Sequence, residues 1–397
     1  MIKANNFKII LILGLLTALG PFSIDMYLPG FSGIATDLNT TVAKVAMTLS
    51  SYFIGISAGQ LLYGPLLDRY GRKIPLFTGL LVYIFASLGC VFVKDIDNFI
   101  GLRFIQAIGS CAATVASVSM VRDLFPVKEI PKVFSMLMLV VGLSPMLAPT
   151  VGGYVTANFG WQMVFVILMC LGIIILLASH FGLPTTYTPD ATISLKPKPI
   201  IKNFWSVLKE PQFYTYAFTG AISFSGLFTY VAASPILFMD IFQVDAKTYG
   251  WIFAFMSCSF IGASQLNSVL LRKYTSEQMI FSALITQSVI ILIFLITALN
   301  NLLGLYETIG LLFLYLGCLG ISNPNTAGLT LAPFTKNTGS ASALMGAIQL
   351  GLGAVASFAV GTFVINSMIP MILIMTTTTI TALFILQIGK RTIKVKH

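Results

Sequence analysis

Twelve apolar segments, each long enough to cross a membrane, dominate this chain of 397 residues. A transmembrane helix needs about 20 predominantly apolar residues. The segments form two sets of six on either side of a longer polar stretch, and they cover 8–28, 43–66, 74–94, 99–121, 132–157, 161–183, 211–236, 246–271, 277–299, 304–328, 338–364 and 368–389. We therefore predict an all-α integral membrane protein with twelve transmembrane helices.

The low charge content excludes an ordinary soluble domain. Charged residues make up 9% of the chain and hydrophobic residues 57%, whereas soluble domains carry about 25% charged residues. The net charge of +10 is scattered between the apolar segments, so we expect no nucleic-acid partner. The five cysteines lie inside apolar segments without a C-x-x-C pair, which disfavours disulfides and metal binding.

The basic residues predict which side each loop occupies. With both termini in the cytoplasm, 19 of the 23 Lys and Arg residues fall on the inner side and three fall in outer loops. The acidic residues divide evenly between the two sides, six and six. Because the positive-inside rule counts only Lys and Arg, this distribution predicts cytoplasmic termini.

The two sets of segments predict two pseudo-symmetric halves, 1–183 and 211–397, joined by a cytoplasmic linker, 184–210. Leu66–Tyr70 aligns with Leu270–Tyr274 at the end of the second segment of each half. The first segments end alike, in Tyr27-Leu28-Pro29 and Ala233-Ser234-Pro235. Parallel repeats of this kind frame a central cavity in transporters that open alternately to the two sides.

We expect two charged side chains to lie well inside the membrane, Asp25 in the first apolar segment and Arg103 in the fourth. A charge at the centre of a membrane helix costs about 2.5–3.5 kcal/mol, so such residues pair or face a wet cavity. Asp25 can become neutral by protonation, whereas Arg103 cannot. We therefore predict that Asp25 carries protons and that Arg103 pairs with it. The alternatives are that Asp25 lies shallow in the headgroup layer and that Arg103 snorkels to the membrane surface.

A charged turn is predicted between the second and third segments. It contains Gly64, Asp68, Arg69, Gly71, Arg72 and Lys73, and we expect the two glycines to supply the sharp bend. Asp68 and Arg72 are four residues apart, so they share one face if the helix continues. Asp123 ends the fourth segment on the same side and is a candidate partner for Arg72. These contacts predict a cytoplasmic gate, and the alternative is a turn that only sets topology.

The fifth segment contains residues that bend and thin a helix, namely Pro145, Pro149, Gly152 and Gly153. Proline removes intrahelical hydrogen bonds, and glycine allows close helix approach. A rocking hinge and ordinary membrane packing both fit this composition. Polar residues inside the segments are candidates for lining a substrate cavity, and five are selected: Tyr27, Gln106, Tyr230, Asn323 and Gln349.

These motifs resemble the major facilitator superfamily, and closely its bicyclomycin/chloramphenicol-resistance (Bcr/CflA) branch of drug:proton antiporters. Gly64 to Lys73 matches the loop between the second and third spans of the superfamily. Ile24–Pro29 resembles the first-span signature of the branch, and Arg103–Gly109 resembles the fourth-span motif of proton-coupled members. Ala148–Gly153 resembles the fifth-span antiporter motif, with Ala148 where the family usually has Gly.

The resemblance implies a proton-coupled efflux transporter that exports small amphipathic drugs or related compounds from the cytoplasm. It also implies a multi-pass protein of the bacterial inner membrane that works as a monomer, without a cofactor, and is driven by the proton gradient. Two other tasks stay open on the same fold: export of an endogenous metabolite or siderophore, and uptake by proton symport. A membrane-embedded enzyme is disfavoured, because the two histidines, His180 and His397, lie at a segment end and at the C-terminus.

Overall fold

The protein is a bundle of long helices. The computed structural model describes residues 4–126, 129–184, 189, 197–334, 338–363 and 367–396. Within these ranges twelve helices are long and apolar enough to cross a membrane, and no strand occurs. The first half of the chain forms α1 (Ala4–Asp25), α2 (Phe31–Asp37), α3 (Val42–Tyr70), α4 (Lys73–Phe92), α5 (Ile96–Leu124), α6 (Ile130–Phe159) and α7 (Gln162–Gly182). The second half forms α8 (Pro197–Leu208), α9 (Pro211–Pro235), α10 (Ala246–Leu270), α11 (Ser276–Leu299), α12 (Leu305–Leu331), α13 (Thr338–Phe363) and α14 (Ile369–Lys396).

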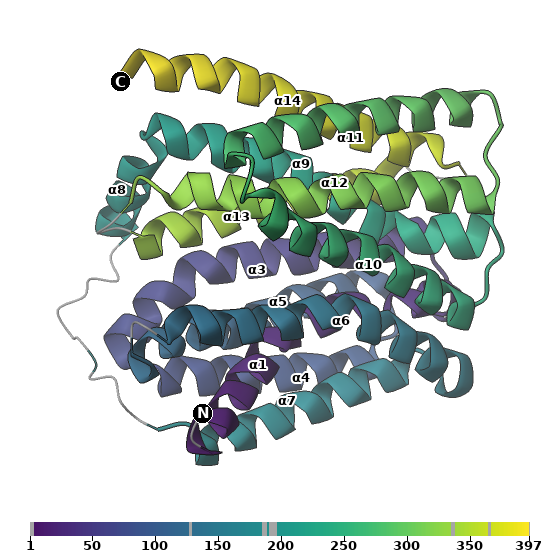
Figure 1. The fold of residues 1–397 in the computed structure, drawn as a ribbon. Helices are drawn as coiled ribbons and strands as arrows, with labels where there is room; N and C mark the ends of the chain where they lie inside the picture. Colours follow the sequence, from purple (N-terminus) through teal and green to yellow (C-terminus); the bar gives the residue numbers. More distant parts are fainter. Residues whose placement is uncertain are drawn as a thin grey trace.

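The helices lie in two groups, α1–α7 and α9–α14, which contact each other mainly through α3 against α13 and α6 against α10 (Figure 1). The boundaries predicted for the two halves stay a prediction. The linker contains a helix that the sequence did not lead us to expect, α8, which packs on α9 and α13. We call the end of the bundle that carries the turn between α3 and α4 the basic end, and the other the opposite end. The chain termini lie at the basic end, on the left in Figure 1.

Both repeated Pro segments change the helix type. In the first half, α1 stops at Asp25 and a short 3₁₀ helix, η1 (Leu28–Gly30), leads into α2. In the second half, α9 stops at Pro235 and continues as a π-helix, η2 (Ile236–Ile241). Short π-helical turns are frequent at functional sites. The weak repeat in the sequence therefore marks the same irregular position in both groups of helices.

The charged turn is shorter than the sequence suggested. Helix α3 runs through Gly64 and Pro65 to Tyr70, so only Gly71 and Arg72 connect it to α4. Gly71 has φ +81°, a conformation that favours glycine because it has no Cβ. Gly64 is helical and supplies no bend. The prediction that both glycines bend the chain is therefore wrong for Gly64.

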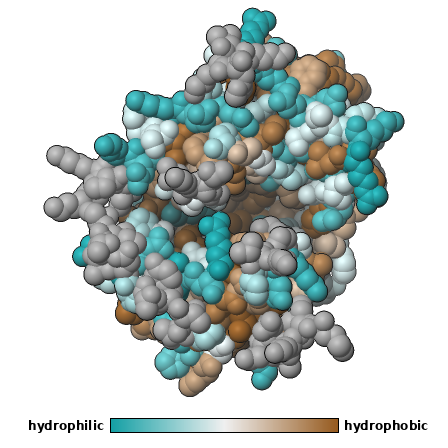
Figure 2. All heavy atoms as spheres, turned by 60° about the vertical axis from the view of Figure 1, so that its left-hand side comes forward, coloured by the Kyte–Doolittle hydropathy of each residue, from teal (hydrophilic) through white to brown (hydrophobic). Residues whose placement is uncertain are grey.

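The two groups close on each other at the opposite end and separate at the basic end. Near the opposite end the Ser32 hydroxyl donates to Asp240 Oδ1 at 3.2 Å, and Lys247 Nζ lies 5.6 Å from the centre of the Tyr154 ring. Viewed from the basic end, the surface is hollowed in the middle and the hollow has apolar walls (Figure 2). The structure therefore represents a state that is open at the basic end.

Candidate functional site

Arg103 lies in an aromatic cage inside the first group of helices. Its side chain has no exposed surface, and its guanidinium carbon lies 4.2 Å from the Tyr27 ring centre and 4.3 Å from the Tyr52 ring centre. Nη1 donates to Gln106 Oε1 at 2.5 Å and Nη2 donates to the Ser23 carbonyl at 2.8 Å. Cation–π contacts and these two hydrogen bonds replace part of the water that the guanidinium loses, whereas the buried Nε has no hydrogen-bond partner among the described residues. The snorkelling alternative is therefore wrong.

The end of α1, rather than a carboxylate, supplies the negative charge for Arg103. Because α1 ends at Asp25, the Ser23 carbonyl is one of the last four, which lack a partner inside the helix. The guanidinium binds this oxygen and meets the negative end of the helix dipole. Among the ion pairs of the described residues, none joins Arg103 to Asp25. The expected direct pair is thus absent in this state, and Arg103 instead holds the helix turn that carries Asp25.

Two predicted cavity residues belong to this cage. Gln106 has no exposed surface, and its Nε2 donates to the Ser87 hydroxyl at 2.7 Å. Tyr27 is equally buried, and its hydroxyl shares a hydrogen bond of 2.8 Å with Thr48. Neither side chain lines a cavity in this structure, because both are buried against Arg103.

Asp25 lies where the two groups of helices meet. Its side chain is 5% exposed, so protein rather than solvent encloses the carboxyl, and its depth relative to the headgroup layer stays a prediction. It lies within electrostatic range of the phenols of Tyr230 and Tyr249, which belong to the second group. The Tyr249 hydroxyl shares a hydrogen bond of 2.8 Å with Ser234, whereas the buried Tyr230 hydroxyl has no hydrogen-bond partner among the described residues. Within the same part of the chain, no cation lies within ion-pair distance of Asp25.

The two glycines of the fifth-span motif face different groups of helices. A Cβ on Gly152 would overlap the carbonyl oxygen of Met26, the residue after Asp25. A Cβ on Gly153 would overlap the carbonyl oxygen of Ala246 at the start of α10. Helix α6 is therefore thin enough to be inserted between the Asp25 segment and the second group.

Pro149 links the same helix to α10 through a displaced hydrogen bond. Proline has no N–H, so the carbonyl of Pro145, four residues earlier, lacks its usual helical partner. The Ser257 hydroxyl of α10 donates to the Phe253 carbonyl of its own helix at 2.9 Å and shares this donor with the Pro145 oxygen at 3.3 Å. Pro149 inside α6 thus leaves a carbonyl oxygen that the second group of helices can contact.

A chain of four phenylalanines that the sequence did not single out crosses from one group of helices to the other through a single pair, Phe53 and Phe228. The Phe53 and Phe228 rings are 4.5 Å apart across the junction, and Phe224 lies 5.3 Å from Phe228 and 6.0 Å from Phe260. Phe224 and Phe228 are four residues apart on α9, so they share one face. The four-residue spacing could have predicted that these two rings share a face. The sequence does not show that this face meets the first group of helices.

Asn323 and Gln349 lie together in the second group of helices. Gln349 Nε2 donates to Asn323 Oδ1 at 3.2 Å. Both line a crevice between α9, α12 and α13 that has about 10 Å³ of free space, enough for about one water molecule. These two predicted cavity residues therefore lie at a crevice too small for a drug-sized compound in this state.

The charged turn forms a network inside the first group. Arg72 Nη1 donates to Asp68 Oδ1 at 2.6 Å, and Arg72 Nε donates to Asp123 Oδ2 at 2.7 Å. Burial alone would lower the pKa of Arg72, but its hydrogen bonds to Asp123 and Asp68 raise it above the ordinary value. The predicted contacts exist, and all three residues belong to the first group. They tie α3 to α5 while the basic end is open.

No metal centre is evident within the described ranges, because no three His, Cys, Asp or Glu side chains lie close enough together. The site chemistry therefore consists of one buried carboxyl, one caged guanidinium and an apolar junction.

Comparison with known proteins identifies the family. The pattern that describes the Major Facilitator Superfamily matches residues 13–360. The chain belongs to this superfamily. Within it, the chain is 32% identical over 373 residues to a bicyclomycin resistance protein homolog of Haemophilus influenzae, covering 94% of each chain. It is 28% identical to the multidrug resistance protein MdtL of Klebsiella pneumoniae, covering 84% of this chain and 83% of that one.

Solved structures of the superfamily share the fold. A D-xylose–proton symporter aligns with a TM-score of 0.75 at 15% identity, covering 96% of this chain and 97% of that chain. A bacterial homolog of the human lysosomal transporter Spinster, in an inward-facing and occupied conformation, aligns with a TM-score of 0.76 at 13% identity, covering 98% and 96%. This major facilitator chain is thus a multi-pass membrane transporter of the bicyclomycin-resistance branch.

Proposed function

We propose that this protein exports small amphipathic compounds from the bacterial cytoplasm in exchange for protons, by alternating access. The observation that carries the proposal is the Asp25 carboxyl, which is buried at the junction of the two groups of helices without an ion-pair partner among the described residues. Relatives named for bicyclomycin resistance and multidrug resistance support drug-like substrates.

In this mechanism the basic end faces the cytoplasm and the hollow admits the compound. Its apolar walls suit amphipathic molecules, which leave water for such surfaces. A proton that reaches Asp25 from the other side neutralises the carboxylate, and a neutral carboxyl is far cheaper to bury than a charged one. Protonation therefore changes the relative stability of the two openings.

The membrane potential supplies enough energy for this exchange. One elementary charge that moves through 100 mV releases about 2.3 kcal/mol. This energy supports a concentration ratio of about 50-fold, because every 1.4 kcal/mol is about tenfold. No cofactor is needed for the proposed cycle.

Replacement of Asp25 by Asn tests the proposal. In everted vesicles, Asp25→Asn should abolish proton-driven accumulation of a fluorescent drug but preserve exchange of labelled for unlabelled compound. Asp97→Asn is the matched control, because Asp97 is a surface carboxylate with a side chain 79% exposed. If proton-driven accumulation by Asp25→Asn equals that of the wild type, Asp25 has no coupling role.

The direction of transport separates the alternatives. The fold is shared with a D-xylose–proton symporter, so the architecture permits uptake as well as export. An antiporter accumulates the compound in everted vesicles when their interior is acidified, whereas a symporter loses it. Labelled metabolites tested beside the dye distinguish a dedicated metabolite exporter from a drug exporter.

We further propose that the protein is a monomer of the inner membrane with both termini in the cytoplasm. The excess of Lys and Arg on the corresponding loops supports this orientation. A single cysteine placed at the opposite end, in the α1–α3 region, should be modified by a membrane-impermeant reagent that is added outside the cell. Modification of the α3–α4 turn from outside would reverse the orientation.

A further inference from the structure

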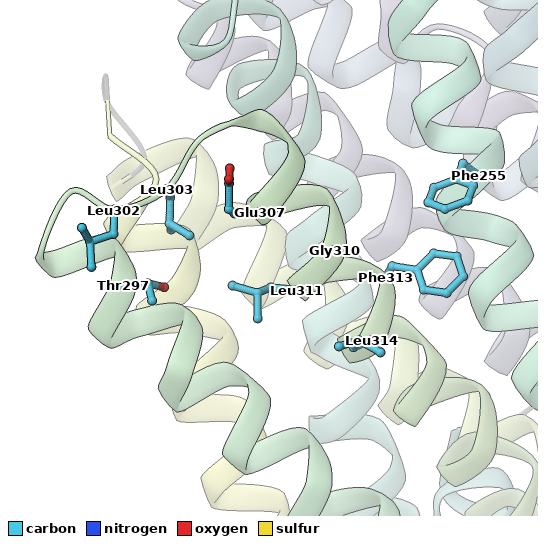
Figure 3. A pocket seen from close by; sticks show the side chains of 9 residues that line it. All are labelled: Phe255, Thr297, Leu302, Leu303, Glu307, Gly310, Leu311, Phe313 and Leu314. Carbon is cyan, nitrogen blue, oxygen red and sulfur yellow. The ribbon is translucent and has the colours of Figure 1, made fainter.

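A second cavity, wide open on one side, lies on the outside of the second group of helices, away from Asp25. It has a volume of 590 Å³, within the range of small-molecule sites of about 300–1,000 Å³. Its walls come from α10, α11, α12 and the connection between α11 and α12 (Figure 3). Its lining includes Phe255, Thr297, Glu307, Gly310 and Leu314.

The cavity faces the lipid rather than the central hollow. Phe255 is 51% exposed and Leu314 is 55% exposed, and on a membrane-spanning helix such apolar surface contacts lipid chains. Phe255 stacks on Phe313 at a ring distance of 4.7 Å, which closes the deep wall. The site is therefore reached sideways from the bilayer.

The depth of the cavity matches one leaflet. It extends along α12 from the helix start after Gly304 to Leu314. Ten residues of α-helix rise about 15 Å, which is half of the hydrocarbon core of about 30 Å. An acyl chain of the leaflet at the opposite end has the length and the apolar surface to lie in it.

The rim of the cavity carries a negative charge. Glu307 Oε2 accepts the Gly304 N–H at 3.1 Å, and no cation lies within ion-pair distance of Glu307 among the described residues. The Thr297 hydroxyl already donates to the Ile293 and Phe294 carbonyls, at 2.8 and 3.0 Å. The rim thus presents a carboxylate one turn inside the helix start, at the level of lipid headgroups.

We propose that this cavity binds one acyl chain of a phospholipid whose headgroup ammonium pairs with Glu307, as in phosphatidylethanolamine. An anionic headgroup without an amine, such as phosphatidylglycerol, would be repelled by the same carboxylate. The site is independent of the direction of transport and of the role of Asp25.

Glycine 310 provides a variant that fills the cavity without a clash. A Cβ at Gly310 meets no atom within 4 Å, so Gly310→Leu adds a side chain to the cavity wall without moving the backbone. Gly328 is the matched control, because it lies on the same helix, has equal free space and does not line the cavity. Glu307→Gln removes the charge and keeps an oxygen that can accept the Gly304 N–H.

The test reconstitutes the full chain in nanodiscs of equal phosphatidylethanolamine and phosphatidylglycerol and counts retained lipids by native mass spectrometry. Wild type and Gly328→Leu should retain phosphatidylethanolamine in preference to phosphatidylglycerol. Glu307→Gln should reduce this preference about two- to five-fold, as for a partly exposed ion pair, and Gly310→Leu should reduce retention of both lipids.

Two results would overturn the proposal. Equal lipid retention by Gly310→Leu and Gly328→Leu would show that the cavity holds no chain. A wild type without preference for the amine headgroup, unchanged in Glu307→Gln, would show that Glu307 recognises nothing. Thermal unfolding of each variant in detergent verifies that it is folded.

Discussion

At the scale of single residues, the buried cation Arg103 depends on neutral partners. Removing one partner from a buried charged group costs more than the hydrogen bond itself, because the remaining group is left without solvation. The guanidinium has two oxygen partners, Gln106 Oε1 and the Ser23 carbonyl. Gln106 also binds Ser87, so one side chain satisfies two buried groups.

Gln106→Leu is therefore expected to destabilise the protein by about 1–3 kcal/mol, because Arg103 Nη1 and the Ser87 hydroxyl both lose a partner. Thermal unfolding in detergent measures the change. Gln349→Leu is the matched control, since the Gln349 amide makes a partly buried hydrogen bond to Asn323 and its loss should cost less. An equal loss of stability in the two variants would contradict the importance of the Arg103 cage.

The sequence predicted Asp25 and Arg103 as the key ionisable residues but not how they are connected. Both stand out because charged residues inside apolar segments are rare. Their relation depends on where α1 ends, since that end exposes the Ser23 carbonyl to Arg103. Helix ends are fixed by local backbone geometry that hydropathy does not report, so a direct ion pair was the natural but incorrect expectation for this state.

At the scale of helices, α6 needs a glycine at Gly152, where it touches the backbone after α1, but not at every glycine position along its length. Gly152→Ala should destabilise the protein by about 1–3 kcal/mol and impair export, because the added methyl group overlaps the Met26 carbonyl. Gly142→Ala on the same helix should be tolerated, since the added methyl group would lie 3.9 Å from its nearest neighbour, Ile261. Thermal unfolding and dye export measure both effects, and equal results for the two variants would refute a specific role of Gly152.

The start of α10 should show a pH-dependent contribution to stability. Hydrogen bonds from the Thr248 hydroxyl and N–H lower the pKa of the Asp245 carboxyl, which caps the helix. A lowered pKa in the folded state stabilises above the unfolded value of about 3.9, and this contribution disappears as the pH falls through the folded value.

Asp245→Ala should accordingly lower stability by about 0.5–1 kcal/mol at pH 7, with a difference from the wild type that shrinks as the pH falls through the lowered pKa of Asp245. Unfolding temperatures measured from pH 7 down into the acid range test the trend. A difference that is constant or grows on acidification would exclude the capping role.

Hydropathy predicted the existence of the long helices well, because lipid requires continuous apolar stretches of fixed length. It failed where packing or local geometry decides. The linker helix α8 is too short and polar to resemble a span, and α3 continues through Pro65 because membrane helices tolerate proline when neighbours satisfy the freed groups.

At the scale of the whole molecule, alternating access requires the opposite end to open. Ser32 and Asp240 lie in hydrogen-bond contact across the two groups of helices, so they must separate when that end opens. Nothing in the sequence indicated this contact, because the two residues are 208 positions apart and carry no pattern that relates them.

A disulfide across this contact should therefore stop transport. The double variant Ser32→Cys, Asp240→Cys, made in a background in which the exposed Cys170 and Cys258 are replaced by Ser, should lose nearly all export after oxidation and regain it after reduction. Each single cysteine variant is the control for the substitution alone. Full export by completely cross-linked protein would show that this end stays closed throughout the cycle.

The hydrogen bond from Arg103 to the Ser23 carbonyl also decides with which group of helices Asp25 moves. Because Arg103 lies on α5 and holds the last turn of α1, Asp25 moves together with the first group of helices. A change in the surroundings of Asp25 must then come from movement of the second group of helices. That movement would also change the surroundings of the Tyr230 hydroxyl, which is buried without a partner among the described residues.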